Sequence, residues 1–206
     1  YQPGWPVALL QNSQLRLDDK KLDAWSAQGR LAELSLVGTA VGLQVDNDAI
    51  WLDLQTRSKG KPGEILSALE QLPALSVAHR VMRDLTVGGD EPTETGAHVR
   101  FDLRNVSPSL DVNVDVALTD ATVASALLDL RAASLNGDLR YRTQTGFESM
   151  GITARVFDRQ VAVAMGPQLA TAPDTLLAAQ LDFEAAVSEV LSWRGIKYPL
   201  PAEGVT

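Results

Sequence analysis

The 206-residue chain has no cysteine, only two histidines and few aromatic residues, which make up 5% of the sequence. The lack of cysteine excludes disulfide bonds and thiol catalysis, and it suits either the cytosol or an oxidising compartment. The scarcity of aromatic rings leaves little stacking surface for sugars. Hydrophobic residues still account for 45% of the chain, which predicts a folded protein with a sizeable core.

Positive charge is also scarce, and the formal net charge is −8. The one short basic cluster is RSKGK at 57–61. Nucleic-acid binding needs a basic face, so DNA and RNA are poor candidate partners. No run approaches the ~18 apolar residues of a membrane-spanning helix, and no signal peptide is present. Because the chain starts at Tyr1 without a methionine, we expect one internal or processed segment of a longer protein, covering 1–206.

Residues typical of catalytic and metal sites are not grouped in the sequence. His79 falls in a helical stripe of Val and Met, and His98 falls on the polar face of a strand. We interpret both as structural histidines, because no second histidine stands at a ligand spacing. Residues 46–51 begin like a calcium loop, but Trp51 stands where that loop needs glycine. We therefore expect no catalytic residue, no metal, no cofactor and no enzyme activity.

Strict alternation of apolar and polar residues is the dominant pattern. In LDVNVDVAL (110–118) every second residue is apolar, which predicts a β-strand with one apolar face. Further alternating runs lie at 14–19, 40–45, 49–56, 98–104, 137–143, 151–157, 160–165 and 176–183. About ten strands joined by short turns predict a mainly β fold with antiparallel pairing. The run 143–146 predicts a hairpin turn in which Gly146 has a positive φ.

Helical spacing is confined to a few short segments. Residues 62–72 follow a proline and repeat apolar residues at helical intervals, and 76–85 and 183–195 show similar stripes. Two or three short helices cannot cover the apolar face of about ten strands. Either the sheet closes into a sandwich or barrel, or part of the apolar face stays open as a groove. The acidic run 88–96 is a candidate linker that would divide the chain.

Several of these motifs resemble the AsmA-like proteins of Gram-negative bacteria, in particular the YhdP branch. The resemblance rests on YQPGWP (1–6), on the helix KGKPGEILSALEQLP (59–73) and on AAVSEVLSWRGIKYPLP (185–201). It also rests on a hairpin pattern at 135–166, in which the matching residues are Gly137, Leu139, Tyr141, Gly146, Gly151, Ile152, Ala154 and Phe157. Together these motifs span nearly the whole chain.

The resemblance implies a bridge-like lipid carrier: a long, curved antiparallel sheet in the periplasm whose open, apolar groove moves phospholipid between the inner and outer membranes. An inner-membrane helix would lie outside this sequence, neighbouring repeats of the same chain would flank it, and phospholipid acyl chains would be the partner. Candidate groove-lining residues are Val41, Leu43, Val45, Ile50, Leu52, Leu54, Val99, Phe101, Leu103, Leu110, Val112, Val114, Val116, Leu118, Leu139, Tyr141, Ile152, Ala154, Val156, Val161 and Val163.

Two other interpretations follow from the residues. A closed β-sandwich would pack the same apolar faces together and would act as a structural or interaction domain of the cell envelope. A hydrolase of envelope polymers would need a convergent set of polar residues, which the sequence does not reveal. Periodicity alone favours the sandwich, whereas the family resemblance favours the groove.

Overall fold

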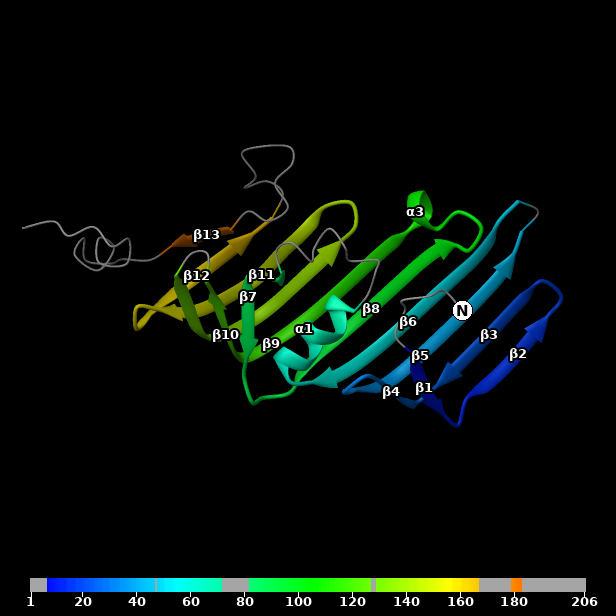
Figure 1. The fold of residues 1–206 in the computed structure, drawn as a ribbon, viewed down its shortest axis with the longest axis horizontal. Coiled ribbons are helices and arrows are strands. Elements are labelled where there is room, and N and C mark those ends of the chain that lie inside the picture. The colour runs from blue at the N-terminus through cyan, green and yellow to red at the C-terminus, as the bar shows by residue number, and fades with distance from the viewer. Residues whose placement is uncertain (1–6, 47, 72–81, 127–128, 167–178, 183–206) are drawn as a thin grey trace, which may run out of the picture.

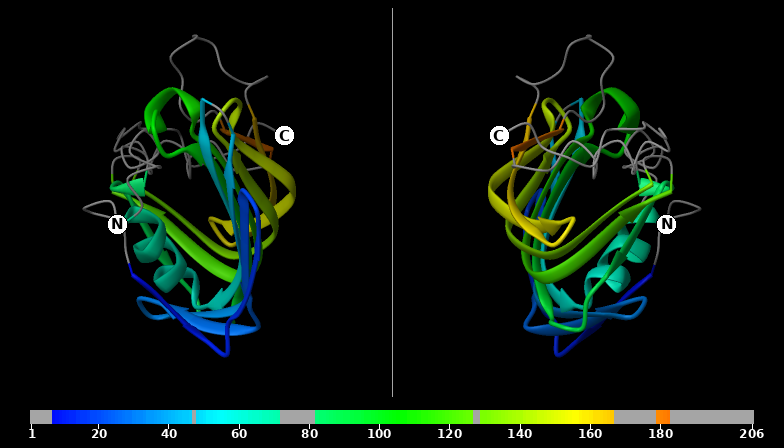
Figure 2. Two further views of the ribbon diagram at one scale, coloured as in Figure 1. Left: turned by 90° about the vertical axis from the view of Figure 1, so that its right-hand side faces the viewer. Right: turned by 90° about the vertical axis from the view of Figure 1, so that its left-hand side faces the viewer.

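The computed structural model describes residues 7–46, 48–71, 82–126, 129–166 and 179–182. In this part of the chain, 13 strands form one open sheet, and every pairing between them is antiparallel. The sheet is long and curved, and its strands run obliquely across its length (Figure 1). End-on views place helix α1 (Pro62–Glu70) on the concave side of this sheet (Figure 2).

The strands follow one another as a meander, since most are joined by short turns. Their bounds are β1 (Ala8–Gln11), β2 (Gln14–Asp18), β3 (Lys21–Ser26), β4 (Gln28–Leu31), β5 (Leu34–Val45), β6 (Ile50–Gly60), β7 (Leu85–Gly88), β8 (Thr93–Asp102), β9 (Asp111–Ser125), β10 (Leu130–Arg142), β11 (Gly146–Val156), β12 (Arg159–Met165) and β13 (Ala179–Asp182). A single helical turn, α3 (Val106–Ser109), connects β8 to β9.

Strand order in the sheet departs from chain order at two places. One edge of β5 is shared by β3 and β4, which pair with different halves of it. Likewise β8 and β7 share one edge of β9, so that β6 pairs directly with β8. Helix α1 fits between β6 and β7 in the chain and therefore crosses the concave face at this point (Figure 1).

The prediction of a mainly β, open antiparallel sheet is confirmed. The closed-sandwich alternative is wrong for the described residues, because all 13 strands belong to one sheet that does not close. Without a second sheet, the only described cover on the concave face comes from α1 and the segment at Met82. The apolar face is consequently left partly open to solvent.

Helix α1 confirms the helix expected at 62–72. Pro62 occupies its first turn, and the Glu64 carboxylate accepts a hydrogen bond from the backbone N–H of Lys61 at 2.8 Å. The second expected helix, 76–85, lies mostly outside the described residues, but its last residue is wrong: Leu85 begins strand β7. The third, 183–195, lies entirely outside them.

The structure describes both the turn expected at 143–146 and the linker expected at 88–96. Gly146 has a φ of 76° directly after the turn between β10 and β11, as the hairpin pattern predicted. The second half of the acidic run 88–96 is strand: residues 93–96 belong to β8 and pair with β6, and residues 94–96 also pair with β9. The hydrogen-bonded ladder therefore passes through this run, where the sequence suggested a linker.

Candidate functional site: an apolar groove

The concave face carries apolar rows that run from strand to strand. Cross-strand partners share a face, so the pairing register identifies each row. The first apolar row contains Leu17, Leu22, Leu43, Leu52 and Phe101 on β2, β3, β5, β6 and β8. The second apolar row contains Leu15, Ala24, Val41, Leu54, Val99 and Val112, and it extends one strand further, to β9.

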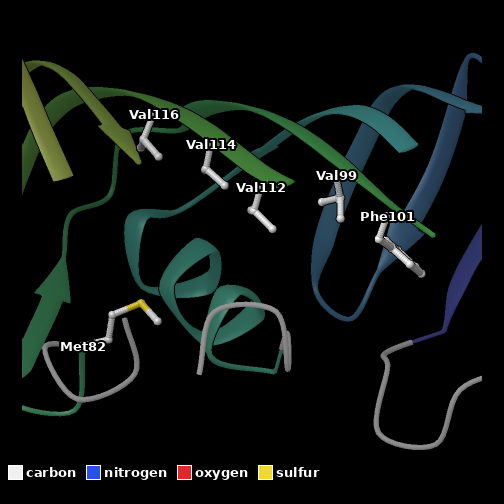
Figure 3. Close-up of a cluster of buried hydrophobic side chains, with 6 residues drawn as sticks. All are labelled: Met82, Val99, Phe101, Val112, Val114 and Val116. Carbon is white, nitrogen blue, oxygen red and sulfur yellow. The ribbon is translucent and has the colours of Figure 1, made fainter. Parts of the chain in front are cut away.

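These rows run into the first of two buried clusters, and Leu118 links that cluster to the second. The first cluster comprises Met82, Val99, Phe101, Val112, Val114 and Val116, and in Figure 3 its five strand residues leave the sheet on the side where α1 and Met82 lie. The second is centred on Val156 and Val161 at the β11–β12 end of the sheet. Leu118 packs against both clusters. The apolar surface therefore extends from β2 to β12.

Exposure rises along the first apolar row from the centre of the sheet to its β2 edge. Phe101 is 3% exposed, Leu22, Leu43 and Leu52 are half-buried, and Leu17 is 78% exposed. Soluble proteins rarely leave a contiguous apolar surface of this kind without a use for it. The apolar surface is therefore open to solvent at its β2 end.

A small apolar cavity lies where α1 and Met82 approach the sheet. It holds about 40 Å³ and is lined by Leu69, Met82, Val114, Val116, Leu139, Tyr141 and Phe147. The rings of Tyr141 and Phe147 form one wall, with their centroids 5.0 Å apart. Burial raises the pKa of Tyr141 above its usual value, so this wall is uncharged at neutral pH. The cavity can take methylene groups but offers almost no polar contact.

The convex face has the opposite character. Asp115 receives hydrogen bonds from Arg140 at 2.8 Å and from Arg142 at 3.1 Å. Burial raises the pKa of Asp115, but these two guanidinium groups outweigh that effect and bring it below the usual range. The His98 ring nitrogen lies 3.1 Å from an Asp53 carboxylate oxygen, a pair the sequence did not suggest because 45 residues separate the partners. Charge and apolar surface are thus segregated to the two faces.

Most of the predicted groove-lining residues meet on the concave surface. Leu43 pairs with Leu52, Val45 with Ile50, and Ala154 with Val161. Ile152 pairs with Val163 at the far end, and Leu110 packs against the first cluster from just before β9. Leu103 is the exception: it follows the end of β8, is 43% exposed and belongs to neither buried cluster.

Several residues of the concave apolar face were not predicted from the sequence. Leu15 and Leu17 were visible as alternating residues, but nothing in their spacing showed that their strand pairs with the groove strands. Met82, Leu69 and Phe147 belong to the cavity, yet each lies outside the alternating runs. Hydroxyl side chains on β5, β6 and β8 also interrupt the apolar face. The buried ones include Thr39, Ser58, Thr93 and Thr95.

Other kinds of site are not evident in the described part of the chain. There, no three His, Asp or Glu residues are placed to hold a metal ion together. None of the helices described there has both the length and the apolar character needed to cross a membrane. Comparisons with models of known protein families, with curated proteins and with solved structures find no match to this chain.

Proposed function

We propose that the protein is a groove segment of a lipid carrier, in which acyl chains lie along the concave apolar face. The observation that carries the proposal is the pair of apolar rows, which cross five and six strands and become exposed at β2. A closed core would bury such rows completely. An open surface of this length is suited to a long, flexible, apolar ligand.

The dimensions of the groove agree with an acyl chain. The second apolar row crosses six strands, and five inter-strand steps of ~4.8 Å give about 24 Å. One leaflet of a bilayer core is about 15 Å deep, half of the ~30 Å hydrocarbon thickness. One row is thus long enough to shield a whole acyl chain from water. Each shielded methylene is worth about 0.8 kcal/mol.

The same geometry favours carriage over catalysis, and we propose that the protein is not an enzyme. The His98–Asp53 pair lies on the convex side, away from the apolar rows. A lipid in the groove would therefore meet methyl groups and hydroxyls rather than an acid–base pair. The polar head group would remain in solvent at the mouth of the groove, where no specific recognition is required.

The cellular setting of the proposal comes from the resemblance of the motifs to AsmA-like proteins. We propose a periplasmic location, with phospholipid moving between the inner and outer membranes and with flanking repeats of the same chain extending the groove. An inner-membrane anchor in a longer polypeptide belongs to this proposal. The absence of cysteine is compatible with this compartment.

Site-specific photo-crosslinking tests the proposal directly. Leu43 and Gln44 are consecutive on β5 and project to opposite faces, so they form a matched pair. A benzophenone amino acid at each position should be irradiated in the presence of vesicles of phosphatidylethanolamine and phosphatidylglycerol. We expect a lipid adduct by mass spectrometry at position 43 and none at 44. Equal labelling at both positions, or none at 43, would refute acyl binding in the groove.

A further inference from the structure

Helix α1 occupies part of the groove in which the acyl chain is proposed to lie. It leaves β6 at Gly60 and crosses the concave face over the start of β8 (Figures 1 and 2). Ile65 and Ala68 form one buried cluster with Leu34 of β5, and Leu69 lines the cavity beside Val114 and Val116. An acyl chain following the sheet toward β9 would therefore meet this helix.

Two threonines lie on the concave face beside the start of α1: Thr93 pairs with Gly60, where an added Cβ would lie 3.0 Å from the Glu64 carboxylate of the helix, and Thr95 pairs with Ser58. Thr93 is 0% exposed and Thr95 is 6% exposed, yet neither hydroxyl has a hydrogen-bond partner among the described residues. Buried hydroxyls usually form a hydrogen bond, as Thr39 and Thr56 do on the same face, where their hydroxyl oxygens are 3.1 Å apart. Each unpartnered hydroxyl lowers the equilibrium constant for docking α1 onto the sheet by about 5- to 150-fold.

A packing defect lies at the other end of the helix. The cavity of about 40 Å³ lies between Leu69 of α1 and Val114 and Val116 of the sheet. Its walls are apolar, so it gains nothing from holding a water molecule. One movement, in which α1 lifts away from the sheet, would remove the void and would also expose the two hydroxyls to hydrogen-bond partners.

The described contacts of α1 are compatible with such a movement about its N-terminal end. Lys61 pairs with Asp90 at 2.9 Å, and Pro62 packs close to Gly89. Both charged groups are exposed, so their ion pair changes an equilibrium by about fivefold at most. Beyond Pro62, only Ile65 and Ala68 of the helix are fully buried. Leu66 and Leu69 pack against the first cluster as partly buried side chains, so the described contacts that oppose lifting are one exposed ion pair, Pro62 and four apolar side chains.

We propose that α1 is a gate in the lipid groove. It pivots near Gly60 and Lys61, and an acyl chain takes its place against Val114 and Val116. In the open state the hydroxyls of Thr93 and Thr95 reach water or the ester oxygens of the lipid, so their hydrogen-bonding need is met. This inference rests on the proposed function, and it adds a rate-controlling step within the same groove.

A reversible cross-link tests the gate, and a chain without cysteine makes the chemistry unambiguous. In the variant with Leu34→Cys and Ala68→Cys, the two thiols would replace side chains of the same buried cluster. The protein should be bridged with a short bifunctional thiol reagent and mixed with vesicles containing a pyrene-labelled phospholipid. We expect bridging to slow uptake of the labelled lipid at least tenfold, and cleavage of a reducible bridge to restore it. Each single cysteine variant, treated identically, is the control.

Removing the unpartnered hydroxyls gives a second test that needs no cross-link. Thr93→Val with Thr95→Val keeps the shape of the side chains and stabilises the docked helix. We expect uptake of the labelled lipid to slow by about fivefold or more, together with a higher melting temperature. The control is Thr119→Val with Thr153→Val, which makes the same substitution at two residues of the convex face and should leave the uptake rate unchanged.

The possible outcomes separate the gate from the function on which it rests. If bridged protein and the Thr93/Thr95 variant take up lipid at the wild-type rate, the gate is refuted while the groove stands. If wild-type protein takes up no labelled lipid, both the gate and the lipid carrier fail. Slower uptake in both variants, with normal uptake in both controls, supports the gate.

Discussion

Leu43 of β5 and Leu52 of β6 are direct cross-strand partners on the concave face, whereas the next residue, Gln44, pairs with Trp51 on the convex face. One step along the chain therefore separates the apolar groove from the polar exterior. This alternation allows a charge to be placed on either side of the sheet at nearly the same position. It also permits a sharp comparison of effects on function and on stability.

Leu43→Glu should abolish lipid uptake while leaving the protein folded. Leu43 is half-buried in an open groove, so the new carboxylate can reach water, and we expect a loss of about 1 kcal/mol of stability. Gln44→Glu on the opposite face is the control and should change neither property. Urea unfolding and uptake of pyrene-labelled phospholipid are the measurements. Collapse of the fold in Leu43→Glu would indicate that the face is packed rather than open.

Ile152→Ala should be among the most damaging single truncations. Ile152 is almost fully buried and pairs with Val163, so its removal leaves a cavity between β11 and β12. We expect a loss of about 2–5 kcal/mol, as for other buried large-to-alanine changes. Val37→Ala removes an exposed apolar side chain and should shift stability by less than about 0.5 kcal/mol. Thermal melting of both variants provides the comparison.

Gly137→Ala should destabilise the crossing of β10 and β11. Gly137 has a φ of 126°, and an added Cβ would lie 2.7 Å from the carbonyl oxygen of Gly151. The backbone strain alone costs about 1–3 kcal/mol, and the steric clash adds to it. Gly96→Ala is the matched control, because an added Cβ there meets nothing within 4 Å. A melting temperature unchanged in Gly137→Ala would contradict this account of the close approach between Gly137 and Gly151.

Asp102 should make the stability of the sheet depend on pH in the acid range. Hydrogen bonds from the backbone N–H groups of Arg104 and Ile50 lower the pKa of its carboxyl below the usual value of about 3.9. A group with a lowered folded-state pKa stabilises fully above its unfolded pKa and loses that contribution as the pH falls through the folded value.

The Asp102→Asn variant isolates this contribution. We expect its free energy of unfolding to lie below that of wild type at pH 6, and the difference to shrink as the pH falls below about 4. Urea unfolding at a series of pH values is the measurement. A difference that grows toward low pH would have the wrong sign and would exclude the proposed role of these hydrogen bonds.

The strands of this protein were predictable from sequence because one face meets water and the other does not. That environment imposes strict alternation, and the run containing Val112, Val114 and Val116 was assigned to the correct face. The extent of each strand was less visible: β9 continues to Ser125 through residues whose alternation is disturbed near Asp120, where φ is positive. Alternation in the sequence reflects which side chains are buried and not which backbone groups are hydrogen-bonded. The part of a strand that lies beyond the alternating run is therefore not predicted.

The choice between sandwich and groove lay beyond the pattern itself. Both arrangements need the same alternation at Val41 or Leu54, and they differ only in what covers the face. The contacts of the cavity residues Leu69 and Met82 could not be predicted from sequence, because they depend on the path that the chain takes between β6 and β7. The pairing of His98 with Asp53 was hidden for a related reason, since register between β6 and β8 is a tertiary property.

Strands that are neighbours in the chain are mostly neighbours in the sheet, so the sheet can become longer or shorter by the gain or loss of hairpins. Each strand is hydrogen-bonded only to its immediate neighbours in the sheet, so stability is a sum of local terms rather than the property of one closed core. Inserting or deleting a whole hairpin would leave the remaining ladders intact, as in other quasi-one-dimensional architectures. Selection can therefore set the distance that such a protein spans hairpin by hairpin, without redesigning its interior.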